Sequence, residues 1–449
     1  MKGEGDSHPT LSSDQFDDGS EGAGNQKYYE NREEGDRVAN GANQMVLVAR
    51  TIVAFILIIA IGAVGLAMNS WISTNEINNF KESFHSDATK IINNIDQTIH
   101  ETLDAADSFV IDAVSIARET DQEWPYVTIP SFAVKTSKVL QQTKSFSVSM
   151  LPVVGPAQVK KWENYTKDHA NTWIEESLNI QEELGGNVNR HYSAVDYIYD
   201  LDGLPVEEPA NLPFYLPSWQ SAPLAIADSS ELLYNLDTLR NVHVVDSIGQ
   251  VFQTKKYVVS EFANVIHNTT DDEEVEHKMK YRNWMSRRVD NPDEEALEPT
   301  SIMYVPVLHN ADKSIDIKKD ENIIVAVFSY HFLWKHLVQD VLPPNSHGVA
   351  VVFSEECSEG EAFAFTYAVS GEEAIYLGSG DKHSPRYDNL AISATLSGEE
   401  EDGHCIKKVT VYPSREMEEE YRTNTASVFI GVSLGIFLFT AVLFTVYGE

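Results

Sequence analysis

Residues 51–68 read Thr-Ile-Val-Ala-Phe-Ile-Leu-Ile-Ile-Ala-Ile-Gly-Ala-Val-Gly-Leu-Ala-Met and contain no charged residue. With the apolar residues 46–49 before them, they reach the roughly 20 residues that a helix needs to cross a bilayer. Trp71 follows at the position of an interfacial aromatic residue. A cleaved signal peptide would need a short basic lead and a core of about 7–15 residues. The block therefore predicts an uncleaved transmembrane helix over residues 45–71.

A second uncharged, apolar block covers residues 428–447. A buried helix of a soluble protein is the competing interpretation, but the length favours a second transmembrane helix over residues 426–449. Two spans place both termini on one side of the membrane and residues 72–425 on the other. Arg32 and Arg37 precede the first span and Arg50 lies near its start, which favours a cytoplasmic N-terminus.

Two further signals favour an extracellular central region and a plasma-membrane location. Asn164 and Asn268 each begin an Asn-X-Thr glycosylation sequon between the two blocks. Cys357 and Cys405 also lie between the blocks, and a cysteine pair in an oxidising compartment is expected to form a disulfide.

The charge of the chain excludes one class of partner. The sequence has 69 acidic and 33 basic residues, a formal net charge of −36. Nucleic-acid binding needs a basic face, so nucleic acid is not an expected partner. Two cysteines are too few for a four-cysteine zinc site. Neither a metal nor a cofactor is expected.

Three regions that differ in composition lie before and between the apolar blocks. Residues 1–44 are polar and mostly acidic, which predicts a disordered cytoplasmic tail. Residues 72–299 begin with a stalk helix and form the membrane-distal part of the folded region, whereas residues 300–425 are rich in strands. The stalk is predicted from apolar residues spaced three or four apart, as on one helical face, namely Ile77, Phe80, Phe84, Ala88, Ile91, Ile95, Ile99, Leu103, Ala106, Val110 and Ala113.

The strand-rich region predicts the fold class. Strands are expected over residues 301–308, 323–330, 348–353, 362–369, 374–378 and 406–412, with a short helix over residues 331–342. Helices are expected over residues 156–184 and 257–267. This order favours an antiparallel sheet with helices on one side, the α+β class.

None of the sequence motifs between or within the apolar blocks indicates a set of catalytic residues. Gly431 and Gly435 frame a nucleophile-elbow pattern, but they lie in the second apolar block, where the strand–turn–helix context of that motif is missing. The same glycines form Gly-X-X-X-Gly, a candidate helix-dimer contact in lipid. The segment Gly380-Asp381-Lys382-His383 is compatible with a site loop and with a plain turn.

Several segments together resemble the sensor regions of diatom receptor-type nucleotide cyclases. They are Val-Leu-Pro-Pro-Asn-Ser-His-Gly-Val-Ala-Val-Val-Phe at residues 341–353, Tyr-Leu-Gly-Ser-Gly-Asp-Lys-His at 376–383, Val-Tyr-Pro-Ser at 411–414 and Leu-Pro-Ser-Trp-Gln-Ser-Ala-Pro at 216–223. The resemblance covers residues 45–447 and is strongest after residue 300. It implies a CHASE-like extracellular sensor with a PAS/Cache-like antiparallel sheet, flanked by two transmembrane helices.

In that family a cytoplasmic class III cyclase domain follows the second span and makes a cyclic nucleotide. This chain stops at Glu449, so no cyclase residue carries over, and catalysis by these residues is not expected. The sequence favours a homodimeric membrane receptor for a small molecule, with Trp219, Gln220 and Tyr304 as candidate ligand-binding residues. The competing interpretation, which the residue types favour, is that these three are core aromatics and turn formers. A surface-tethered ectoenzyme and a structural or adhesive protein without a ligand are the alternatives.

Overall fold

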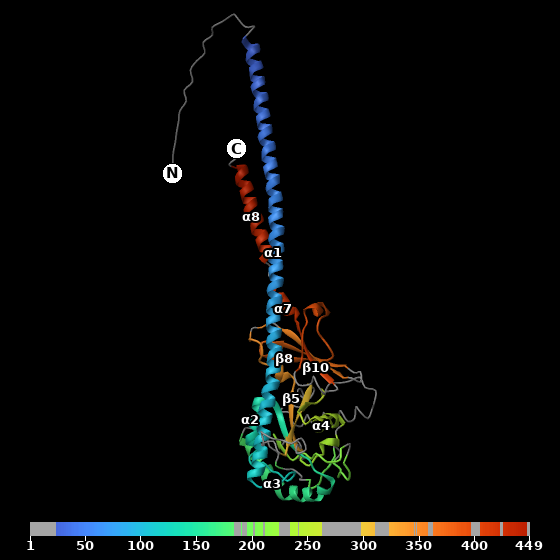
Figure 1. Ribbon diagram of the computed structural model, residues 1–449. Coiled ribbons are helices and arrows are strands. Elements are labelled where there is room, and N and C mark those ends of the chain that lie inside the picture. Colours follow the sequence, from blue (N-terminus) through green and yellow to red (C-terminus); the bar gives the residue numbers. More distant parts are fainter. Residues whose placement is uncertain are drawn as a thin grey trace, which may run out of the picture. The chain divides into compact units, whose positions relative to one another are not determined.

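The computed structural model describes residues 24–183, 190, 195–200, 203–209, 212–223, 234–240, 242–262, 298–309, 323–344, 346, 348–357, 362–396, 405–422 and 425–446. The chain divides into two units. Unit 1 contains Met1–Asn75 and Thr423–Glu449, and unit 2 contains Glu76–Arg422. Figure 1 labels the main elements along the chain.

Unit 1 contains the apolar helices. The helix α1 (Gly24–Glu119) begins in unit 1 and runs without a break into the sequence of unit 2. It is long and apolar enough to cross a membrane, and its most apolar stretch is wholly unburied. The helix α8 (Thr425–Val446) is a second apolar helix, and the apolar stretch among its described side chains is Ser427–Leu443. Length and composition alone do not show that either helix crosses a membrane, so the two-span topology stays a prediction.

The start of α1 differs from the sequence prediction. Residues 24–44 were expected to be disordered, but they are helical and continuous with the apolar block. Extending an existing helix adds one hydrogen bond for each residue fixed and requires no new nucleus. A polar segment can therefore continue a long apolar helix that it could not form alone. Residues 1–23 of the expected tail lie outside the described residues.

Unit 2 contains two five-stranded antiparallel sheets, which confirms the α+β class. The first sheet has the order β2-β1-β5-β4-β3, and the second has the order β8-β7-β6-β10-β9. The first comprises β1 (Ser145–Pro152), β2 (Gln220–Ala222), β3 (Val258–Val259), β4 (Thr300–Leu308) and β5 (Ile324–Leu333). The second comprises β6 (Val349–Cys357), β7 (Ala362–Ser370), β8 (Glu373–Ser379), β9 (Ile392–Thr395) and β10 (Cys405–Pro413).

Besides α1 and the strands, the described residues of unit 2 form helices of three to 25 residues. They are α2 (Phe132–Thr143), η1 (Pro156–Gln158), α3 (Val159–Glu183), η2 (Thr238–Arg240), α4 (Val242–Thr254), α6 (Lys335–Val338), η4 (Pro385–Leu390) and α7 (Arg415–Tyr421). Their positions confirm the predicted helix over residues 156–184. The helix predicted over residues 257–267 is wrong in its described part, because Val258 and Val259 pair with β4 as strand β3.

The first sheet combines strands from both sides of residue 300, where the sequence predicted a boundary between two subdomains. Strands β4 and β5 pair with β3 and β1 from the earlier part of the chain. One face of this sheet packs against α4, through Ile248 of α4 and Ile302 and Val327 of the strands. The other face packs against α1 and α2. Residues 76–422 therefore form one compact unit, in place of two successive subdomains.

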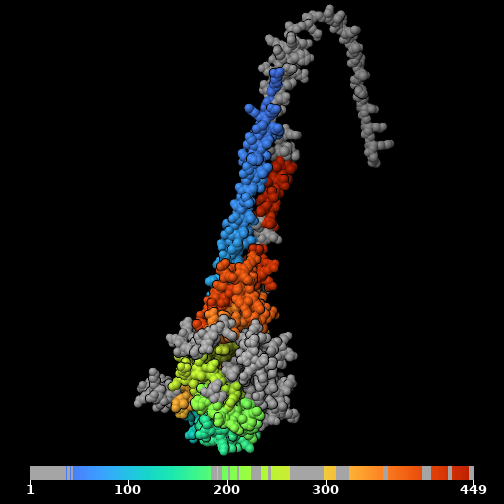
Figure 2. All heavy atoms as spheres, turned by 90° about the vertical axis from the view of Figure 1, so that its right-hand side faces the viewer, coloured from blue at the N-terminus to red at the C-terminus, as the bar shows by residue number. Residues whose placement is uncertain are grey.

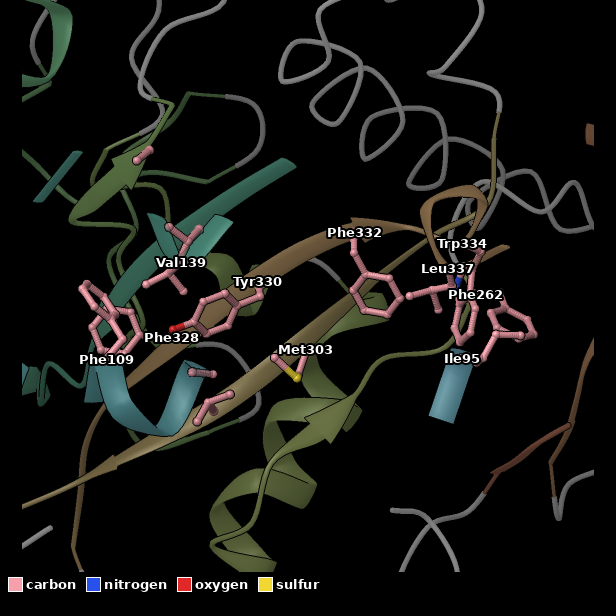
Figure 3. Close-up of a cluster of buried hydrophobic side chains, with 14 of the residues drawn as sticks. Ile95, Phe109, Val139, Phe262, Met303, Phe328, Tyr330, Phe332, Trp334 and Leu337 are labelled. Atoms are coloured by element: carbon pink, nitrogen blue, oxygen red, sulfur yellow. The ribbon is translucent and has the colours of Figure 1, made fainter. Parts of the chain in front are cut away.

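Aromatic side chains join α1 to the first sheet. Phe109 of α1 lies edge-on against Phe328 of β5, with ring centroids 5.0 Å apart, and edge-on against Phe132 of α2 at 5.9 Å. Figure 3 shows Phe109 beside Phe328 at one end of this cluster, and Ile95 near Trp334 and Leu337 at the other. The same hydrophobic cluster includes residues of the second sheet. The helical face predicted for the stalk is thus a core-facing surface from Phe80 to Ala113, with Ile99 and Leu103 only partly buried, whereas Ile77 before it is exposed.

Candidate functional site: the junction of the stalk helix and the two sheets

Trp219 and Gln220 lie in a buried aromatic cluster at the β2 edge of the first sheet. The Trp219 ring lies edge-on to Trp162 and Trp173, at 5.4 Å from each, and its indole N–H donates to the hydroxyl of Thr128 at 3.2 Å. The Gln220 carboxamide pairs with the backbone of Ile129, because Oε1 accepts from its N–H at 2.7 Å and Nε2 donates to its C=O at 3.1 Å. Both side chains are wholly buried and hydrogen-bonded within the protein.

Tyr304 lies on the opposite face of the same sheet. It is buried in the cluster around α4, whereas Trp219 belongs to the cluster that contains α1. The structure therefore does not bring the three candidate residues together around one space. Their role in ligand binding stays a prediction, and their burial is also what core residues show.

A small cavity lies where α1 meets both sheets. Its lining includes Ile99 and Thr102 of α1, Met303 and Phe332 of the first sheet, and Lys407 of the second. The cavity volume is about 40 Å³, which has room for about three water-sized groups. Pockets that hold metabolites measure about 300–1,000 Å³. This cavity does not accommodate a molecule of that size without rearrangement.

A buried ion pair at this junction joins the second sheet to the first. Lys407 Nζ of β10 lies 2.9 Å from Glu355 Oε1 of β6, and the two side chains are 4% and 0% exposed. Lys407 also donates to the backbone oxygen of Val259 in β3 at 3.3 Å. The other oxygen of Glu355, Oε2, accepts from the backbone N–H of Phe262 at 3.1 Å. Each charge is therefore paired, and both groups bind the segment that contains β3.

A second ion pair lies near the same junction. Lys335 Nζ lies 3.0 Å from Glu298 Oε1, and the hydroxyl of Tyr367 donates to Glu298 Oε2 at 3.4 Å. Burial, together with the Glu298 carboxylate, raises the pKa of the Tyr367 phenol well above its ordinary 10.0. The Tyr367 hydroxyl therefore keeps its proton and remains a donor to Glu298 throughout the physiological range.

A segment that we call the strap, residues 380–391, crosses from one edge of the second sheet to the other. It follows β8 at one edge and leads to β9 at the opposite edge. Thr366 of β7 fastens its start, because its Oγ1 donates to the Gly380 oxygen at 2.8 Å and accepts from the Lys382 N–H at 3.0 Å. Residues of the second sheet and the strap form much of the orange surface in Figure 2.

His383 is the central contact of the strap. Its ring stacks on Tyr412 of β10, with centroids 3.6 Å apart and planes 6° from parallel. Its Nδ1 lies 2.5 Å from Asp381 Oδ1, and its Nε2 lies 2.7 Å from Asp388 Oδ1. Burial lowers the pKa of His383, but the hydrogen bonds and charges of Asp388 and Asp381 outweigh it and raise the pKa above 6.5.

The strap also holds α7, the last helix of unit 2. Glu418 of α7 accepts from Arg386 at 2.6 Å and from the hydroxyl of Tyr387 at 2.8 Å. Tyr421, at the end of α7, contacts Phe80 of α1 at a ring distance of 6.2 Å. The helix begins with an N-cap, since Ser414 Oγ accepts from the N–H of Met417 at 3.1 Å. The helix α7 and the part of α1 that contains Phe80 are thus in contact within unit 2.

The cysteines lie opposite each other in the second sheet, because β6 and β10 pair antiparallel with Cys357 facing Cys405 in register. Directly opposed residues of antiparallel strands have Cα atoms about 4.5–5.5 Å apart, and disulfides require about 4.4–6.8 Å. The register is therefore compatible with the predicted disulfide, which remains a prediction.

The remaining predicted residues are scattered. Asn164 is exposed on α3, whereas the threonine of its sequon, Thr166, is buried. Asn268 lies outside the described residues. Gly431 and Gly435 lie on α8, and a Cβ added at either would meet no described neighbour within 4 Å. Their role as a dimer contact stays a prediction.

Sequence reasoning missed the junction contacts. Lys407 and Glu355 at the junction, and Glu418 where the strap meets α7, gave no signal, since charged residues on strands and helices are ordinarily solvent-exposed. His383 was noticed only as part of a loop or turn. Among the described residues, no group of three His, Cys, Asp or Glu side chains is placed to hold a metal ion.

A comparison of the chain with models of protein families finds no match, and a comparison with curated protein sequences finds none either.

Proposed function

We propose that this chain is a two-span membrane sensor, in which unit 2 responds to its surroundings and passes the response to the membrane through α1 and α7. The observation that supports this most directly is the continuity of α1. The same helix carries an apolar stretch that is wholly unburied and, further along, a face that is buried in the core of unit 2. A helix is a rigid rod, so a rearrangement of the core turns or shifts it along its length.

The finer parts of the proposal come from the sequence. The apolar blocks span the membrane, the termini are cytoplasmic, and unit 2 is the extracellular, CHASE-like sensor with a PAS/Cache-like sheet. Two copies associate as a homodimer, and the output is a cyclic nucleotide made by a cyclase domain outside this chain. The resemblance to receptor-type cyclases and the apolar blocks support these parts.

The experiment that tests the proposal rotates one part of α1 relative to the other about the helix axis. The chain is fused before the catalytic domain of a receptor cyclase, and cyclic-nucleotide production is measured in membranes. Inserting one alanine between Asn75 and Glu76 turns the two parts of α1 by about 100°, whereas inserting seven residues turns them by about 20° net. We expect the single insertion to change basal output severalfold and the seven-residue insertion to restore it.

The competing function, a structural or adhesive surface protein without a ligand, is favoured by one observation, the small volume of the junction cavity. Such a protein needs its helix only as an anchor. Equal output from the parent fusion and both insertion variants would therefore contradict the sensor and favour the anchor.

A further inference from the structure

The contacts of His383 identify the protonation state that the strap requires. Both ring nitrogens face a carboxylate oxygen, Asp381 Oδ1 at 2.5 Å and Asp388 Oδ1 at 2.7 Å. A neutral imidazole has one N–H donor and one lone pair, so it can donate to only one of them. The imidazolium donates to both. The arrangement is therefore that of a protonated ring, which also suits stacking on the Tyr412 face.

The strap is attached at three places, and His383 is the middle one. Thr366 holds the start, His383 holds the middle on β10, and Tyr387 and Arg386 hold the end on α7. The His383 side chain is 15% exposed, so protons from solvent reach it. Loss of its proton removes one of the two carboxylate bonds and leaves that carboxylate facing a lone pair.

We propose that the strap is a proton-operated fastening of α7, closed when His383 is protonated and loosened when it becomes neutral. The bound ligand is a proton, which needs no cavity. Because α7 is the last described helix of the chain before the second apolar helix, loosening it frees the end of unit 2 that leads toward that helix. The link to signalling rests on the proposed function, but the fastening itself does not.

The direction of the pH dependence follows from the neighbouring charges. Asp381 and Asp388 of the strap are the charged groups that act on the ring, and β10 contributes the phenol of Tyr412. The pKa of His383 is raised, despite burial, by these two carboxylates. The fastening is therefore complete below pH 6.5, the ordinary value for histidine, and is lost as the pH rises through the raised pKa.

The charged groups around Tyr387, where the strap meets α7, also favour the state in which the strap holds α7. Glu418 and Arg415 of α7 and Arg386 of the strap act on Tyr387. Burial and the Glu418 carboxylate raise the pKa of that phenol above 10.0. The Tyr387 bond to Glu418 thus does not titrate in the range where His383 does, so the pH-dependent step is assigned to His383.

The test uses the full chain in lipid nanodiscs. Backbone hydrogen exchange of residues 380–391 and 415–421 is followed by mass spectrometry from pH 6 to 9 and corrected for intrinsic rates. Imidazole C2 exchange in the same samples gives the pKa of His383 itself. We expect that pKa to lie above 6.5 and both segments to lose protection about two- to fivefold as His383 deprotonates, the range for exposed ion pairs.

Two variants test whether the pH-dependent loss of protection originates at His383 and how it reaches α7. His383→Gln keeps a neutral N–H donor group but cannot take up a proton, so we expect it to abolish the pH step in both segments. Tyr387→Phe removes one of the two strap bonds to Glu418 and leaves that of Arg386, so the step should persist in the strap and become smaller in α7. His169→Gln is the matched control, because His169 also stacks on a tyrosine, Tyr165, at 4.2 Å.

Two results would overturn the proposal. One is a pH step that persists unchanged in His383→Gln, and the other is a His383 pKa at or below 6.5 in the parent protein. Neither result depends on membrane topology or on output in the cyclase fusion, so failure of the fastening is distinguishable from failure of the proposed function.

Discussion

Lys407→Met is expected to destabilise unit 2 by about 3–5 kcal/mol, because it leaves the Glu355 carboxylate buried without its counter-charge. Neither side chain reaches solvent, since Lys407 is 4% exposed and Glu355 is not exposed at all. The lost contacts also include the bond from Lys407 to the Val259 oxygen, which joins the second sheet to the first. Urea unfolding of the full chain in nanodiscs, followed by tryptophan fluorescence, measures the loss.

The double variant Lys407→Met/Glu355→Gln separates pairing from packing. Its glutamine is neutral but still accepts the backbone N–H of Phe262 that Glu355 accepts in the parent protein. Replacing both charges of a buried pair is often close to neutral, so the double variant should recover most of the loss. Arg415→Met is the exposed control, because Arg415 and its partner Glu419 are 81% and 58% exposed, and it should leave the urea midpoint close to that of the parent protein. A single-variant loss as small as this control would contradict the junction as described.

Trp219→Ala is expected to cost about 3–5 kcal/mol, the range for deleting a large buried aromatic side chain. The ring is wholly buried between Trp162 and Trp173, and its N–H bonds to Thr128. The same urea titration measures the change. Trp219→Phe keeps an aromatic ring but removes the donor, so it should cost about 1–3 kcal/mol.

The control for Trp219 is Leu204→Ala, at a side chain that is 60% exposed. It should change the free energy of unfolding by no more than about 0.5 kcal/mol. A loss below about 1 kcal/mol for Trp219→Ala would show that the ring does not support the core. That result would favour ligand binding over a core role for Trp219.

Local periodicity predicted much of unit 2. The three- and four-residue spacing identified Phe80, Phe84, Ile91 and Ile95 as one face of α1, and they are buried. The β-branched runs after residue 300 marked β4 to β8 and β10 to within a few residues. Both patterns work because they reflect how a single element exposes one side to a core.

Pairing between distant segments was not predictable in the same way. Nothing local in Val258–Val259 shows that it pairs with β4, and a strand of two residues has no period to detect. The helix α4 was not predicted, although Val244, Ile248 and Val251, which are buried, recur at the four- and three-residue spacing of one helical face. The strap was missed because its position follows from the strand order of the second sheet, which the sequence does not display.

The candidate site shows the same limit. Aromatic residues set among prolines, such as Trp219, give one signal for a core and for a pocket. Burial and partners distinguish these two, and they place Trp219 and Tyr304 on opposite faces of the first sheet. The residues at the junction are charged, and only the fold shows that Lys407 and Glu355 meet inside it.

The position of unit 2 relative to the membrane is tested most directly by labelling single cysteines in intact cells with a membrane-impermeant maleimide. The cysteines are placed at Glu119, which is exposed in unit 2, and at Ser7 and Glu449 near the two ends of the chain. A two-span sensor with unit 2 outside predicts that Glu119→Cys is labelled in intact cells, whereas Ser7→Cys and Glu449→Cys are labelled only after permeabilisation. Labelling of either terminal cysteine in intact cells, or protection of Glu119→Cys, would contradict it.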